Sequence, residues 1–149
     1  MFLGGDIMKK IISLILILLM VFSLTSCGGD VSDVKIDYGK SEIYTKEDMD
    51  AAIEEIKCEF RSSTWRDMKL LSITYSSDSF CNEENIAWLK DLAHGEIVFD
   101  QVIEFYGEFY VSDKAEIAGG LEHDSVMEYG WHLGRSNGGE WHLMTWGVG

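Results

Sequence analysis

Residues 126–149 read VMEYGWHLGRSNGGEWHLMTWGVG, and this stretch decides the fold. The sequence SNGG at residues 136–139 is typical of the tight turn that joins two antiparallel strands. On both sides of the turn, apolar residues alternate with polar ones, which is the period of a strand with one buried face. We therefore expect a β-hairpin here.

The alternation also predicts the register of this hairpin. A three-residue loop with a glycine in the left-handed conformation places Leu133 opposite Leu143. One face then buries Tyr129, Trp131, Leu133, Trp141, Leu143 and Thr145. The other face carries His132, Gly134, Glu140, His142 and Met144. His132 and His142 become diagonal neighbours about 7–8 Å apart, so a metal would need further ligands such as Glu140, and a plain polar outer face is the alternative.

Two helices are expected before the hairpin. The first covers residues 46–60, because Thr45 can cap it, Asp48 forms a capping-box pattern and apolar residues recur at helical spacing. Its predicted buried face is Met49, Ala52, Ile53, Ile56 and Phe60. The second helix follows Asn82, a good N-cap, and runs to about residue 92. Its predicted buried residues are Ile86, Trp88 and Leu89.

Two further stretches alternate as strands do, residues 68–76 and residues 96–111. In the second stretch, Gly107 interrupts the apolar face and suggests a bulge or a bend. Asp100, Glu104 and Glu108 lie on its polar face. Steps of four residues along a strand separate them by about 13 Å, whereas the carboxylates of a glycosidase are about 5–9.5 Å apart. No two of them form a catalytic pair alone, so they are solvated, or one lies in a pocket with a partner from another strand.

This order of elements predicts a single α+β domain, with the N-terminal helices packed on one face of a curved antiparallel sheet that ends in the hairpin. The arrangement resembles the cystatin-like and NTF2-like folds, an analogy of fold that implies no function. The aromatic residues of the hairpin and of residues 96–111 fit either the core of the sheet or a platform for sugars. These are Tyr106, Tyr110, Tyr129, Trp131, Trp141 and Trp146.

Residues 8–27 read MKKIISLILILLMVFSLTSC, a basic start followed by an apolar run and small residues, which is typical of a signal peptide. The apolar run covers only residues 11–24, short of the roughly 20 residues that span a bilayer. The ending LTSC resembles the lipobox of bacterial lipoproteins. That resemblance implies acyl chains on Cys27 and cleavage before it. We therefore expect a signal peptide at 1–26, a flexible tether at 27–43 and the domain at 44–149, with translation starting at Met1 or Met8.

The cysteines and the net charge limit the bonds and the binding partners that the exported chain can have. Besides Cys27, the exported chain would hold Cys58 and Cys81, which either form a disulfide or are two separate thiols. The whole chain carries 12 basic and 26 acidic residues. Cleavage removes Lys9, Lys10 and Asp6, so the formal charge changes from −14 to −15. Such a domain is unsuited to nucleic acid and to anionic lipid, so acyl chains on Cys27 would have to attach it to the membrane.

The chain also resembles small uncharacterised lipoproteins of Gram-positive bacteria. The resemblance rests on the lipobox, on DMDAAIEEI at 48–56, on NEENIAWL at 82–89 and on SNGGEWHLMTWG at 136–147. It implies a domain held at the extracytoplasmic face of the cell membrane. No motif calls for a cofactor or a metal. The first hypothesis is a non-enzymatic domain that binds a cell-surface protein or a small ligand. The second is a small hydrolase that uses a carboxylate or a histidine in a cone-shaped pocket.

Overall fold

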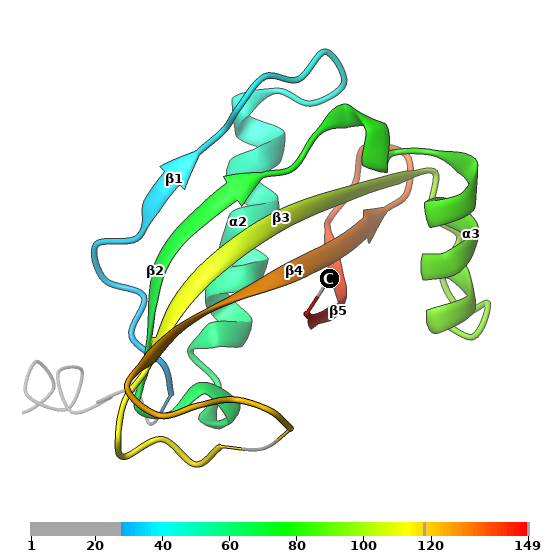
Figure 1. The fold of residues 1–149 in the computed structure, drawn as a ribbon. Helices are drawn as coiled ribbons and strands as arrows, with labels where there is room; N and C mark the ends of the chain where they lie inside the picture. Colours follow the sequence, from blue (N-terminus) through cyan, green and yellow to red (C-terminus); the bar gives the residue numbers. More distant parts are fainter. Residues whose placement is uncertain (1–27, 118, 149) are drawn as a thin grey trace, which may run out of the picture.

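The computed structural model describes residues 28–117 and 119–148 (Figure 1). The predicted signal peptide and Cys27 lie outside the described residues. The elements are β1 (Lys35–Asp37), α2 (Lys46–Phe60), β2 (Met68–Tyr75), α3 (Glu83–Leu92), β3 (Gln101–Val111), β4 (Ser125–Arg135) and β5 (His142–Gly147). Single 3-10 turns cover Ser63–Trp65 and Asp78–Phe80. The fold is α+β.

The sheet has five strands in the order β1-β2-β3-β4-β5. It is mixed and not purely antiparallel, because β1 runs parallel to β2 while the other neighbours are antiparallel. The strand β1 comes from the segment predicted as a flexible tether. The segment is attached to the domain from its first described residues, since Gly29 N donates to Phe60 O and Asp30 forms a β-bridge with Lys69. A side chain at Gly28 would put its Cβ 1.8 Å from Arg61 O, so only glycine allows this approach.

The prediction for α2 is confirmed, both in its first and last residues and in its N-terminal cap. Thr45 is the N-cap, its Oγ1 accepts from Asp48 N at 3.1 Å, and Asp48 accepts in return from Thr45 N. All five residues of the predicted apolar face are buried: Met49, Ala52, Ile53, Ile56 and Phe60.

The two helices cover opposite faces of the sheet, which corrects the prediction that both lie on one face. The α2 face of β3 carries Ile103, Phe105 and Phe109, which share one core with α2. Val102 points the other way and packs with Leu89 of α3 in a second, smaller core. Figure 1 shows α2 running along the sheet and α3 beside the end where β3 begins and β4 ends. The alternation in β3 identifies two faces, but it does not say which helix covers which.

The hairpin has the predicted pairing of Leu133 with Leu143. Its turn holds Asn137 at φ 54° and Gly138 at φ 65°, and Gly139 N donates to Ser136 O at 2.9 Å. The register then shifts at Met144, so that His132 faces Thr145 and Trp131 faces Trp146. Thr145 was predicted on the core face, and that prediction is wrong. Trp146 lies on the core face instead of Thr145, and its ring stacks on that of Trp131 with the ring centroids 5.7 Å apart.

Gly107 is not a bulge, because the strand β3 pairs without interruption on its β4 side. The irregularity lies in β2, between Leu70 and Ser72. A Cβ at Gly107 would lie 2.7 Å from Trp131 Nε1. Glycine at this position therefore makes room for the largest fully buried side chain of the core.

Candidate functional site

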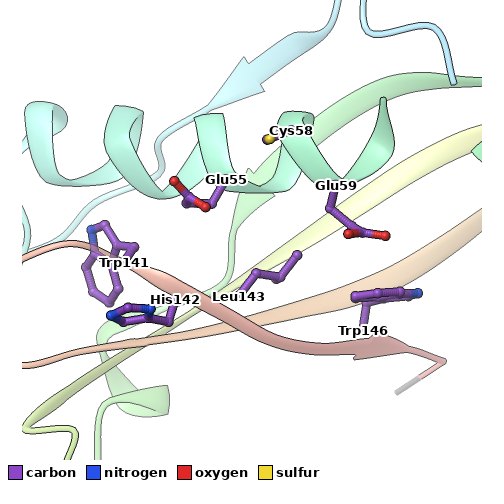
Figure 2. A pocket seen from close by; sticks show the side chains of 7 residues that line it. All are labelled: Glu55, Cys58, Glu59, Trp141, His142, Leu143 and Trp146. Atoms are coloured by element: carbon purple, nitrogen blue, oxygen red, sulfur yellow. The ribbon is translucent and has the colours of Figure 1, made fainter. Parts of the chain in front are cut away.

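An open groove of about 370 Å³ lies between α2 and β5 (Figure 2). The helix lines it with Glu55, Cys58 and Glu59, which are spaced to face one side. The opposite wall consists of Trp141, His142, Leu143 and Trp146. Figure 2 shows the Glu59 carboxylate extending from the helix toward the strand side, while that of Glu55 lies close to the helix. The groove therefore combines negative charge with aromatic surface.

The carboxylates are held to different degrees. Glu59 accepts hydrogen bonds from Trp65 Nε1 and from Ser62 Oγ, both at 3.3 Å, and is half-buried. Glu55 is exposed. One carboxylate is thus fixed by the core beneath it, while the other can adjust to a ligand.

The tryptophans of the opposite wall are set by the core. Trp141 is buried, and its Nε1 donates to Asp48 O at 3.0 Å. Trp146 is half-buried and stacks on Trp131. A second hollow, of about 170 Å³, also has Trp146 in its lining, together with Tyr129 and Leu121. The aromatic surface is therefore preformed.

A buried arginine supports this wall, and sequence reasoning missed it. The Arg135 side chain is 8% exposed and lies 2.6 Å from Asp48 Oδ1. Its Nε donates to Gln101 Oε1 at 2.7 Å, and its guanidinium lies 4.4 Å from the centre of the Trp141 ring. The hydrogen bond from Arg135 holds the pKa of Asp48 below its ordinary value. No local pattern links residue 48 to residue 135, so only the fold brings them together.

The structure joins two of the predicted site residues, Glu104 and His132. His132 Nε2 lies 3.0 Å from Glu104 Oε1, and their side chains are only 15% and 14% exposed, respectively. The rings of Phe80 and Trp88 lie 5.4 and 5.1 Å from the imidazole. Burial by itself would raise the pKa of Glu104, but hydrogen bonds, first among them the one from His132, hold it below its ordinary value. The rings of Phe80 and Trp88 cover part of the pair.

The other predicted site residues do not gather. Asp100 accepts from Asn137 N at 2.9 Å, and Glu108 accepts from Ser72 Oγ at 3.1 Å, so each carboxylate has a separate local partner. His142 is exposed, and its ring lies 6.2 Å from that of Phe99. Within residues 28–117 and 119–148, no three His, Cys, Asp or Glu side chains are grouped to hold a metal ion.

The cysteines and the aromatic residues are likewise separated. Cys58 and Cys81 are not bridged. Cys58 lies near the end of α2, whereas Cys81 packs against the core just before α3. The proposed aromatic platform is split between the two faces of the sheet. Trp131 is buried, while Tyr106 and Tyr110 are exposed on the opposite face.

Comparisons with protein families, with curated proteins and with solved structures find no match. The resemblance to cystatin-like and NTF2-like folds therefore stays a prediction. In the part of the chain that the structure describes, no helix is long and apolar enough to cross a membrane.

Proposed function

We propose that this chain is a lipid-anchored protein of the extracytoplasmic membrane face, and that its domain binds a ligand in the groove between α2 and β5 without transforming it. The open groove is the observation that carries the binding role. Its aromatic wall is preformed, and its acidic wall includes an exposed carboxylate. The partly buried pair of Glu104 and His132, two residues that the sequence indicated as separate candidates, lies outside it.

The anchoring role rests on LTSC at residues 24–27 and on the charge of the chain. Gly28 and Gly29 already pack against the end of α2, so an anchor on Cys27 would hold the domain with no spacer. The segment predicted as a tether would then fix the orientation of the domain instead of giving it reach.

Fractionation of cells expressing the wild type and Cys27→Ser tests the anchor. We expect the wild type in the membrane fraction and its processing to be blocked by globomycin, which inhibits the lipoprotein signal peptidase. Wild-type processing that is insensitive to globomycin would exclude the lipoprotein assignment. The Cys58→Ser variant is the matched control and should fractionate as the wild type does.

The enzymatic alternative has one observation in its favour, the buried Glu104–His132 pair. His132 Nδ1 is buried without a hydrogen-bond partner, as a group awaiting a substrate would be. The pair is largely covered, however, and we rank it below the groove. Hydrolysis that is lost in both Glu104→Gln and His132→Gln, with the groove variants Glu55→Gln and Glu59→Gln active, would reverse this order.

A further inference from the structure

We propose that the occupant of the groove is an extended, positively charged protein segment that pairs with the free edge of β5 and places a lysine or arginine side chain between Trp146 and the carboxylates of Glu55 and Glu59. This inference rests on the proposed binding function of the groove and names its ligand class.

The outer edge of β5 is open to another strand. This strand is the last of the sheet, and no strand of the described residues pairs with its outer side. Edge strands are commonly guarded by lysine, proline, inward charges, short length or bulges, and an edge without enough of these can accept an added strand. The sequence of β5, HLMTWG, contains no lysine, proline or carboxylate, and its only irregularity is the register shift at Met144. The opposite edge, β1, has only three residues, two of which are the charged Lys35 and Asp37.

The charge of the groove selects a cation. Two of its seven lining residues are glutamates, and none is lysine or arginine. Two basic residues near this end of α2, Lys57 and Arg61, approach Glu54 and not the groove glutamates. A cation over the face of a tryptophan gains attraction from the ring, and the formal charge of −14 steers cations toward the domain.

The molecule already contains this mode of binding. The Arg135 guanidinium lies between a carboxylate, Asp48, and the ring of Trp141. The groove offers the same two kinds of partner, Glu59 and Trp146, on its exposed side. Its volume of about 370 Å³ suits one long side chain with its flanking backbone. The second hollow, which also contacts Trp146, offers further space for the bound segment.

The test uses the full chain in neutral detergent and the capped synthetic peptide Thr-Val-Thr-Lys-Thr-Val-Thr. If this peptide forms a strand, it turns Val-Lys-Val to one side. A single lysine limits unspecific attraction to the acidic protein. Binding is followed by calorimetry and by the tryptophan fluorescence of the protein. We expect saturable binding that weakens at least tenfold when the lysine is replaced by glutamine or glutamate.

Two comparisons locate the site. The double variant Glu55→Gln/Glu59→Gln should weaken binding of the lysine peptide at least tenfold. Its control, Glu47→Gln/Glu84→Gln, removes the same charge from exposed positions outside the groove and should change binding by less than twofold. N-methylation of alternate peptide amides on the side that faces β5 should abolish binding. Thermal melts of both double variants verify that they are folded.

The results that would overturn this inference differ from those that would refute the lipid anchor or the binding role of the groove. No binding of the lysine peptide at millimolar concentration overturns it, as do equal losses in the two double variants, which indicate general charge attraction. A glutamine peptide that binds as tightly as the lysine peptide leaves the groove a binding site but refutes the cationic ligand. Unimpaired binding of the N-methylated peptide refutes strand pairing. The anchor is tested separately by fractionation.

Discussion

Replacing Arg135 with methionine should destabilise the domain by about 3 kcal/mol. Methionine keeps much of the packing volume but removes the contacts to Asp48 and Gln101 and the cation over Trp141. Breaking a buried ion pair by deleting one partner costs roughly 3–5 kcal/mol. The Asp48 side chain is 26% exposed, so water solvates part of the abandoned charge and the lower end of this range applies.

A double-mutant cycle separates the pair from the other roles of its members. Asp48→Asn keeps the shape of the side chain and an oxygen for the capping box, yet removes the charge that faces Arg135. We expect the combined variant to be more stable than the sum of the two single losses predicts. The expected coupling is about 1–3 kcal/mol. Urea denaturation at neutral pH, followed by tryptophan fluorescence, gives the free energy of unfolding of all four proteins.

The pH dependence supplies the refutation. The pKa of Asp48 is lowered in the folded state, so its contribution is fully present above the ordinary value of 3.8 and is lost as the pH falls through the folded value. The gap in unfolding free energy between the wild type and Asp48→Asn should therefore narrow in acid, below about pH 4. A gap that stays constant, together with a coupling near zero, would show that Arg135 stabilises the domain through packing and not through its charge.

Three further changes test the packing. Gly107→Ala should cost about 1–3 kcal/mol, because its Cβ would meet the buried indole of Trp131. Thermal melts compare it with Gly147→Ala, where the Cβ meets nothing within 4 Å and the backbone φ is not positive, and a loss no larger than in this control refutes the clash. Leu143→Ala should cost about 2 kcal/mol, because Leu143 packs on the core, and His142→Ala should cost no more than about 0.5 kcal/mol, because His142 is exposed. Urea melts measure both losses, and equal losses would contradict the register. Cys58 and Cys81 should both react with an alkylating reagent in the non-reduced, denatured protein, and protection of the two together, seen by mass spectrometry, would indicate a disulfide.

Local patterns predicted much of the fold. The bounds of α2 and its capping box are encoded within 16 residues, and the pairing of Leu133 with Leu143 follows from a turn and a period of two. No local sequence pattern predicts which face of the sheet α3 covers or which strand β1 pairs with. The strand β1 has three residues, and its pairing depends on β2, which follows α2 along the chain. A short polar segment rich in glycine therefore reads as a tether when it is in fact an edge strand.

The groove was hidden for a related reason. Its acidic wall lies on a helix face that looks merely solvated, and its aromatic wall lies about 80 to 90 residues further along the chain. The shift at Met144 matters most, because one extra residue moves every later side chain of a strand to the opposite face. Strict alternation assigned Thr145 to the core face and did not assign Trp146 to a face of the hairpin. The irregularity brings Trp146 onto Trp131 and into the groove, so strict alternation fails just before the residue that forms the candidate cation site.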